Sequence, residues 1–476
     1  MHNTGKMIVG LITVILFHAG AMNTFSQNAT GYESTLFASE QTTLAASGGG
    51  DRVDELAAEI ASMKSELAKK ADKPSGKGWS SPKLGGRFFM DYATAMNQDW
   101  DGMPMPMPVG NGNNVQNWYG FREARLAVTG TGYDFLDYKF EVGFEKDRSY
   151  NASFKDVFLG IQHVPLLEYV RIGNQYVEDA GSEICNGTTN YTFMEAPAPV
   201  GQHFMSRRLG VTSRHLFADD RVRMFFGAYG ANNISDTHYQ KDDNQGLVLN
   251  TRMTIAPVFC QDGCRLFLVG AYYNFVDSTS NNKKSMAISR PGGWDLYSSY
   301  SLGDYYSDRY QKAGFETVCQ KGRFCVQTDL FLQQYADVNN GPGTSIGNQT
   351  NYGGFVMARW FLTRDYRKYN LKSACWDSVE VSRPYKFMDQ CEVNWPSGYG
   401  AWEVAAMYGF YDAFASLTDT DARLTNQQIG AALNWYWNPQ VKWAVNYIHD
   451  LTDVDYAHND YRPTGDYFGM SCRVAF

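Results

Sequence analysis

The fold is decided by alternating stretches such as Tyr138-Lys139-Phe140-Glu141-Val142-Gly143-Phe144-Glu145. Successive side chains of a β-strand point to opposite faces, so the four apolar side chains here share one face and the three charged ones share the other. The same period of two recurs in residues 169–173, 247–255 and 428–437. This pattern predicts strands that separate an apolar surface from a polar one.

The final stretch of the chain continues the pattern in Tyr467-Phe468-Gly469-Met470-Ser471-Cys472-Arg473-Val474-Ala475-Phe476. Phe468, Met470, Val474 and Phe476 fall on one face of the expected strand. An aromatic residue that ends an alternating strand is typical of bacterial outer-membrane barrels. The same parity places Cys472 on the lipid-facing side.

The spacing of the strands distinguishes a membrane barrel from a soluble sandwich, which would also alternate. Short connections alternate with long polar ones, as expected for periplasmic turns and extracellular loops. Residues 364–398 are the exception, because they are long and lie on the short-turn side. At about 9–11 residues per strand, residues 83–476 accommodate roughly sixteen strands. We therefore predict an all-β chain that forms a transmembrane antiparallel β-barrel.

The composition agrees with this fold class and excludes some functions. The 476 residues are 44% hydrophobic and 15% aromatic, and their formal net charge is −8. A nucleic-acid binder needs a basic face, so we expect no nucleic-acid partner. Beyond the N-terminus no apolar stretch approaches the roughly 20 residues of a membrane helix. A membrane form of this chain must cross with strands.

The N-terminal region divides into four segments. Residues 1–21 read as a signal peptide, with Lys6, a short apolar run and the small-residue site Ala19-Gly20-Ala21. We expect the low-complexity residues 22–50 to be flexible and residues 71–82 to form a linker. Residues 51–70 carry heptad spacing and predict a short periplasmic coiled-coil helix, or else a lone amphipathic helix that packs on the barrel. The heptad positions are Val53, Leu56, Ile60, Met63 and Leu67.

Eight cysteines suit an exported protein, because disulfides persist in oxidising compartments. We predict disulfides over a metal site, since no histidine lies near the pairs. Cys185 and Cys472 have no assigned partner, and the sequence leaves their state open. The candidate pairs are Cys260 with Cys264, Cys319 with Cys325, and Cys375 with Cys391.

The barrel region resembles the phosphate-selective porin O and P family. The resemblance covers most of residues 83–476, in the family's order, and implies a sixteen-stranded homotrimeric porin, often with a periplasmic coiled coil. It also implies that a third extracellular loop, here Gly181–Ser206, folds into the lumen. The matching stretches are Phe121-Arg122-Glu123-Ala124-Arg125-Leu126, Tyr169-Val170-Arg171-Ile172-Gly173-Asn174, Arg208-Leu209-Gly210-Val211, Gly353-Gly354-Phe355-Val356 with Phe361-Leu362-Thr363, and Gly400-Ala401-Trp402-Glu403-Val404-Ala405-Ala406.

Strand parity also identifies candidate residues for ion selectivity. A wall of arginines and lysines could form an anion track in a narrow pore. Alternatively, these cations pair with carboxylates of the lumen and only tune the pore. The expected constriction loop contains no lysine but carries Glu183 and Glu195. The predicted pore-lining cations are Lys139, Arg171, Arg208, Arg214, Arg223 and Arg252.

Three functions fit this sequence. The favoured one is an outer-membrane porin, a passive channel for small hydrophilic solutes, with anions such as phosphate as candidates. The second is a barrel that organises the envelope through its coiled coil and long loops, and the third is a soluble extracellular β-sandwich. The chain lacks the P-loop, the zinc-protease helix motif and the nucleophile elbow, so we expect neither an enzyme nor a cofactor.

Overall fold

The computed structural model describes most of the chain from residue 78 onward. The predicted signal peptide (1–21), flexible segment (22–50) and coiled coil (51–70), and residues 71–77 of the predicted linker, lie outside the described residues. In the described part, no helix is long and apolar enough to cross a membrane. The described ranges are 78–99, 108–109, 117–145, 152–201, 203–231, 246–277, 283–288, 299–307, 309–339, 345–385, 398–417, 420–456, 459–462 and 464–476.

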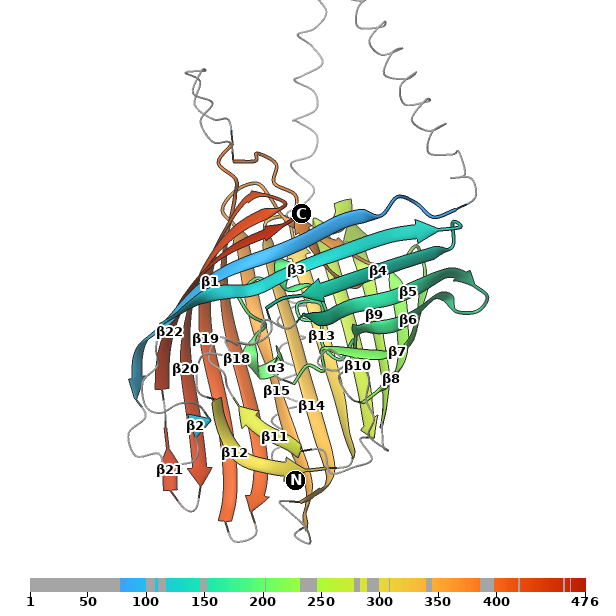
Figure 1. Cartoon of the computed structure of the whole chain (residues 1–476). Helices are drawn as coiled ribbons and strands as arrows, with labels where there is room; N and C mark the ends of the chain where they lie inside the picture. Colours follow the sequence, from blue (N-terminus) through green and yellow to red (C-terminus); the bar gives the residue numbers. More distant parts are fainter. Residues whose placement is uncertain are drawn as a thin grey trace, which may run out of the picture. The chain divides into compact units, whose positions relative to one another are not determined.

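Within these ranges, sixteen antiparallel strands form one closed barrel (Figure 1). The ring closes because the last strand pairs with the first, with Val474 opposite Phe88. Closure leaves no sheet edge whose backbone groups would be unpaired in hydrocarbon. The prediction of a sixteen-stranded barrel is confirmed. In ring order the strands are β1 (Lys83–Asp99), β3 (Trp118–Gly132), β4 (Leu136–Gly143), β5 (Ser153–Val164), β6 (Glu168–Tyr176), β7 (Arg207–Phe217), β8 (Val222–Gly230), β9 (Leu247–Cys260), β10 (Arg265–Asp277), β13 (Arg309–Lys321), β14 (Phe324–Asn339), β15 (Ser345–Phe361), β18 (Ala401–Leu417), β19 (Thr420–Asn438), β20 (Val441–Tyr456) and β22 (Thr464–Ala475).

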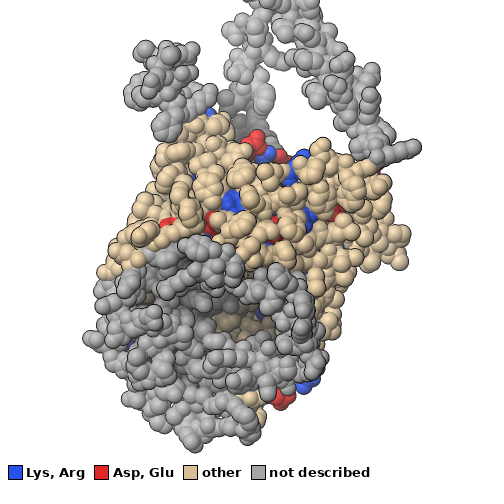
Figure 2. Space-filling view, in the orientation of Figure 1, with Lys and Arg blue, Asp and Glu red and all other residues tan. Residues whose placement is uncertain are grey.

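The two faces of the barrel follow the alternation of the sequence. Apolar side chains such as Phe140, Ile172 and Val211 are exposed on the outer face. Their sequence neighbours, among them Glu141 and Thr212, are buried inside. Figure 2 shows that uncharged side chains cover most of the described surface in this view, with only scattered charges. An apolar outer band is what a lipid bilayer requires of a barrel.

The two ends of the barrel differ. One end has mostly short turns, such as residues 133–135 and 218–221. At the other end short strands project from the longer connections: β2 (Pro108–Val109), β11 (Lys283–Ile288), β12 (Ser299–Tyr306) and β21 (Asn459–Tyr461). The exception lies between β15 and β18 at the short-turn end, where a separate hairpin forms from β16 (Arg367–Asn370) and β17 (Cys375–Val379).

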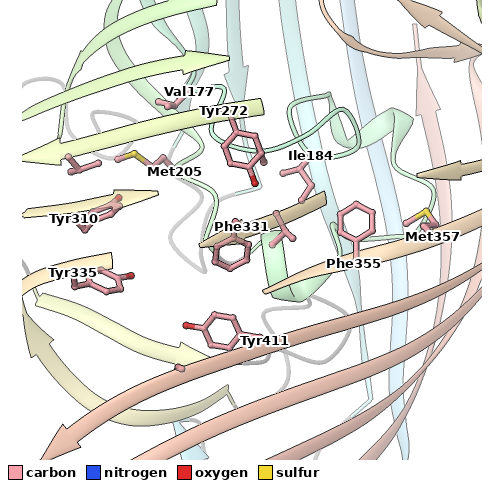
Figure 3. Packing of buried hydrophobic residues seen from close by; sticks show 14 of the residues in the cluster. Val177, Ile184, Met205, Tyr272, Tyr310, Phe331, Tyr335, Phe355, Met357 and Tyr411 are labelled. Carbon is pink, nitrogen blue, oxygen red and sulfur yellow. The ribbon is translucent and has the colours of Figure 1, made fainter. Parts of the chain in front are cut away.

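Two segments fill the interior of the barrel. We call residues 177–201 and 203–206, between β6 and β7, the inserted loop; it contains the 3-10 turn η1 (Thr188–Asn190) and the single-turn helix α3 (Ala198–Gly201). We call residues 367–379 the inserted hairpin. Apolar side chains of the loop pack on the lumen faces of distant strands; Ile184, for example, belongs to the same buried cluster as Phe331 and Phe355 (Figure 3). The lumen therefore contains a packed apolar core as well as polar walls.

Candidate functional site in the barrel lumen

The inserted loop reaches from one wall of the barrel to another. Near its start, the backbone N–H groups of Gly181 and Ser182 donate to Asp329 on β14 and Glu316 on β13, each at 2.7 Å. Further along, the N–H of Met194 donates to Asn446 on β20, at 2.6 Å. Because β14 and β20 are separated by three strands of the ring, the loop passes through the lumen.

Cations of the wall and of the inserted hairpin bind the carbonyl oxygens of this loop. An irregular loop leaves its carbonyl groups without helical or sheet partners, so buried ones need other donors. Arg367 donates to Asn190 O at 2.8 Å, Lys442 to Tyr191 O at 2.7 Å and Arg473 to Thr188 O at 2.6 Å. Lys312 donates to the carbonyl of His203 at 3.0 Å. The basic residues thus stabilise the path of the loop.

The inserted hairpin packs against the same loop from the short-turn end. Its Trp376 is 2% exposed, and the indole N–H donates to Gln327 Oε1 on β14 at 2.8 Å. The guanidinium of Arg359 on β15 lies 4.0 Å from the centre of this ring, within cation–π range. The hydroxyl groups of Tyr369 in the hairpin and Ser182 in the loop are 2.8 Å apart. These contacts therefore fix the position of the hairpin inside the barrel.

Two of the predicted pore-lining cations, Arg252 and Arg223, bind the loop and the hairpin together. Fully buried Arg252 donates to Glu316 at 2.8 Å, to Glu178 at 3.3 Å and to the carbonyl of Ala374 at 2.9 Å. Arg223 binds Glu178 at 2.6 Å and the carbonyl of Lys372 at 3.0 Å. These side chains point inward, as parity predicts, but inserted segments cover them.

The predicted cations Lys139 and Arg208 also have partners. Lys139 lies 2.7 Å from both Glu141 and Asp156. Arg208 donates to two backbone carbonyls at the start of β7. These are the carbonyls of Met205 and Arg207, at 2.7 Å each. Lys139 is therefore part of an ion-pair network, and Arg208 stabilises the point where the loop returns to the wall.

Arg171 and Arg214 contact an aromatic ring. Both lie near the ring of Tyr169, whose centre is 5.5 Å from Arg171 and 4.6 Å from Arg214. Arg171 also lies 3.9 Å over Phe158, and Arg214 donates to the carbonyl of Lys372 at 3.3 Å. Like Arg208, neither has a carboxylate within salt-bridge distance among the described residues. Arg208 is occupied by carbonyl oxygens where the loop returns to the wall, so Arg171 and Arg214 are the members of the predicted track with the fewest polar partners.

The two predicted acidic residues of the constriction, Glu183 and Glu195, are buried and bound to neighbouring groups. Glu183 accepts hydrogen bonds from the N–H of Thr192 at 2.5 Å and from Gln327 at 2.8 Å. Glu195 forms an ion pair with Arg122 on β3, with one N–O distance of 3.0 Å. Burial raises the pKa of Glu195, and the charge of Arg122 opposes that shift. Both glutamates fix the loop in place instead of facing an open channel.

A second ion-pair network covers the wall formed by β1, β3, β4, β5 and the start of β7. Arg87 pairs with Glu123 at 2.6 Å, and Arg125 with Glu145 at 2.7 Å. The side chains of Lys139, Lys155 and Arg87 are 23%, 15% and 14% exposed, whereas Arg252 and Lys312 are 0% exposed. Solvent therefore reaches this wall of the lumen. Its members are Arg87, Arg125, Lys139, Lys155 and Arg207, with Glu123, Glu141, Glu145 and Asp156.

Several lumen residues were not predicted from the sequence. Arg473 lies on the alternating final strand, where parity alone places it inside with Ser471. Arg367 carried no such signal, because it belongs to the inserted hairpin and not to a wall strand. Parity also fails for Arg207, which shares its strand parity with the outward-facing Leu209 but binds Asp156 inside the lumen, at 2.5 Å.

One of the cysteine predictions needs correction. All described cysteines, Cys185 and Cys375 included, carry free thiols in the structure, so Cys260 with Cys264 stays a prediction. In the β13–β14 hairpin Gln320 pairs with Cys325, so Cys319 and Cys325 point to opposite faces and cannot be bridged. Cys375 is also free, but its predicted partner Cys391 lies outside the described residues. No group of three or more metal-ligating side chains occurs in the part of the chain that the structure describes.

Comparison with known proteins gives the following matches. The family model for phosphate-selective porin O and P matches residues 95–476. No curated protein matches the chain. Solved structures with the same kind of fold include OmpT of Vibrio cholerae expressed in the outer membrane (11% identity, 84% of this chain and 99% of that chain, TM-score 0.48). Others are the outer membrane channel DcaP of Acinetobacter baumannii (10%, 85% and 99%, 0.46) and an anion-selective porin from Comamonas acidovorans (11%, 83% and 99%, 0.45). At these TM-scores the structural matches carry no argument about function.

Proposed function

This chain belongs to the phosphate-selective porin O and P family and forms a channel of the bacterial outer membrane, and we propose that the channel favours small anions such as phosphate. The family model covers the barrel from residue 95, near the end of β1, to its last residue. The structure supports passage with a barrel whose charged lumen wall keeps contact with solvent. We infer that solutes follow the wall of β1, β3, β4, β5 and β7, because the opposite wall is covered.

Two cations beside this wall support the anion preference. The wall itself is close to neutral, because its five networked cations face four networked carboxylates and the further carboxylates of Asp91 and Asp137. Arg171 and Arg214 on β6 and β7 form no salt bridge with a described carboxylate, although Glu168 attracts Arg214. Lumen arginines and lysines favour anions in a narrow pore. The observation that carries the proposal is this pair of cations without salt bridges beside a wall that solvent reaches.

Planar bilayers that contain the purified protein test the proposal. In a salt gradient the reversal potential should show anion preference, and added phosphate should reduce the chloride current. The double variant Arg171→Gln, Arg214→Gln should lower the anion-to-cation permeability ratio several-fold. Arg309→Gln is the control, since Arg309 is 56% exposed and far from this pair. Cation preference of the unmodified protein would refute the proposal, and a folded but silent protein would favour the envelope-organising role.

We further propose a homotrimer whose short-turn end faces the periplasm, with residues 51–70 forming a coiled coil there. Short turns are periplasmic in outer-membrane barrels. The heptad spacing places apolar side chains along one side of the helix, where helices of different subunits can pack together. Deleting residues 51–70 should slow or weaken trimer formation without preventing barrel folding. Cross-linking and native mass spectrometry of the full chain and the deletion variant measure this. Unchanged assembly would favour a lone helix packed on the barrel.

A further inference from the structure

Two cysteines lie in contact where the inserted loop packs against the inserted hairpin. The Sγ of Cys375, the first residue of β17, donates to the carbonyl oxygen of Cys185 in the loop at 3.0 Å. The Cys185 thiol donates to the carbonyl of Ala180 at 2.9 Å. Adding ordinary bond lengths to this contact puts the two Cα atoms at most about 8 Å apart. A disulfide spans about 4.4–6.8 Å between Cα atoms, so this upper limit lies about 1 Å beyond the range. Bond formation also requires the Cys185 thiol to turn from the carbonyl of Ala180 toward Cys375.

The backbone around both thiols is held in place. Arg252 donates to the carbonyl of Ala374, next to Cys375, and to the hydroxyl of Ser182 in the loop, at 2.9 and 3.3 Å. Asn186, next to Cys185, donates to the carbonyl of Trp376 at 2.5 Å. Hydrogen bonds between loop and hairpin therefore flank the two cysteines on each side. This keeps the thiols together in every arrangement in which the hairpin is seated.

The other described cysteines do not offer either thiol a comparable partner. Cys325 lies on the lumen face, but its sulfur accepts a hydrogen bond from Arg359 at 3.1 Å. Cys319 points to the opposite face of its hairpin, and Cys472 pairs with outward-facing Met90 and Trp443. The contact of the Cys375 sulfur with the carbonyl oxygen of Cys185 thus brings together two cysteines that are 190 residues apart.

We propose that Cys185 and Cys375 are a disulfide site that fastens the inserted hairpin to the inserted loop. Each thiol loses one proton, the two sulfurs form one bond, and the two electrons reduce an external disulfide of the periplasm to two thiols. Outer-membrane proteins fold in a compartment where such exchange takes place. This inference goes beyond the proposed function, because the bond can be detected without any measurement of transport.

The burial of both thiols indicates at which stage of folding the disulfide would form. Burial raises the pKa of Cys375 to about 11 and the pKa of Cys185 well above its usual range. A buried, protonated thiol reacts slowly, because the thiolate is the nucleophile in exchange. We therefore expect the disulfide to form while the hairpin enters the lumen, before both thiols are buried. Once formed, it prevents withdrawal of the hairpin until it is reduced.

Peptide mapping of the full chain tests the proposal directly. The protein is extracted from outer membranes in denaturant with an alkylating agent present, digested without reduction and analysed by mass spectrometry. We expect one peptide that joins Cys185 to Cys375. Recovery of both as alkylated thiols, or of Cys375 joined to Cys391, would overturn the proposal. This measurement needs no variant and does not depend on folding of a mutant.

A second measurement tests the effect of the bond. Trypsin cleavage after Lys368 or Lys372, both partly exposed in the hairpin, should become several-fold faster when the protein is reduced. Cys185→Ser and Cys375→Ser should show the fast rate with or without reductant. Cys472→Ser is the matched control and should behave like the unmodified protein. Equal rates in the oxidised and reduced unmodified protein would contradict the fastening role.

Discussion

The two walls of the lumen use their charged residues differently. Along β1, β3, β4 and β5 the cations pair mainly with carboxylates of the same wall, and three of these cations, Arg87, Lys139 and Lys155, are 14–23% exposed. Across β9, β13, β20 and β22 the cations bind the backbone of inserted segments and are almost fully buried; Arg252, Lys312 and Arg473 are 0–1% exposed. Arginine and lysine side chains thus line a wall that solvent reaches on one side of the lumen, and on the other side they stabilise a packed core.

This difference teaches that an inward-facing arginine in a barrel need not face the solute. Exposed ion pairs contribute little to stability, so they are free to shape the field along a pore. A buried cation that loses its partners is costly, so its main effect is structural. The strand parity of Arg171 and Arg252 is the same, yet only Arg171 is expected to act on passing ions. The inserted segments account for the difference.

Removal of the hairpin should have the largest effect. Replacing residues 367–379 with a short Gly-Ser linker removes the segment that covers Arg223 and Arg252. We expect a several-fold increase in single-channel conductance, because the covered wall becomes open to water. A deletion of residues 386–397 in the same connection serves as the control. If conductance stays unchanged after the first deletion, the covered wall is not part of the permeation path.

Substitution of one cation on each wall should give unequal losses of stability. Arg252→Met leaves Glu316 buried without its ion partner and should lower the free energy of unfolding by about 3–5 kcal/mol. Lys139→Met removes a partly exposed ion-pair partner and should cost less than about 1 kcal/mol. Urea unfolding in lipid vesicles, followed by tryptophan fluorescence, measures both. Similar losses would show that the two walls do not differ in this way.

Acidification should loosen the inserted loop to a smaller extent. The ring of His203 stacks on Tyr411, with centroids 4.5 Å apart, and burial together with nearby Lys312 lowers its pKa from 6.5 to about 3. Between these values the unfolded loop binds a proton that the folded loop does not. The contribution of neutral His203 to the stability of the folded loop is therefore fully present above pH 6.5. This contribution falls by at most about 1.4 kcal/mol per pH unit as the pH drops to 3.

Hydrogen exchange of the loop amides at pH 7.5 and pH 5, corrected for intrinsic rates, measures this loosening. His203→Phe keeps the aromatic stacking but cannot take up a proton, so its loop should lose the extra exchange at pH 5. Retention of the same pH response in the variant would assign the effect to another group.

Much of the barrel could be predicted from the sequence, because alternation and loop length are local properties. Stretches such as residues 138–145 gave strands and inward faces directly. The inserted hairpin could not be predicted, since its turn and short strands look like any long connection, and the side chain that seats it, Trp376, finds its partners Gln327 and Arg359 only in three dimensions.

The prediction of a disulfide between Cys319 and Cys325 was wrong for a reason that strand register explains. A spacing of six residues suggested that Cys319 and Cys325 close a turn. The turn consists of Gly322 and Arg323, because Lys321 pairs with Phe324, and this shifts the two cysteines out of register by one residue. A shift of one residue in a strand reverses the face of every side chain. The contact between Cys185 and Cys375 had no such local signal, because 190 residues separate them.

The closing strand also gives the barrel an order of assembly. β22 completes the ring by pairing with β1, and its Arg473 binds the carbonyl of Thr188 in the inserted loop. The final contact of the loop therefore becomes available only when the last segment of the chain has been delivered. A chain truncated before β22 would lack both the pairing that closes the barrel and the hydrogen bond from Arg473 to the inserted loop. Closure of the barrel and the final positioning of the loop therefore depend on the same strand.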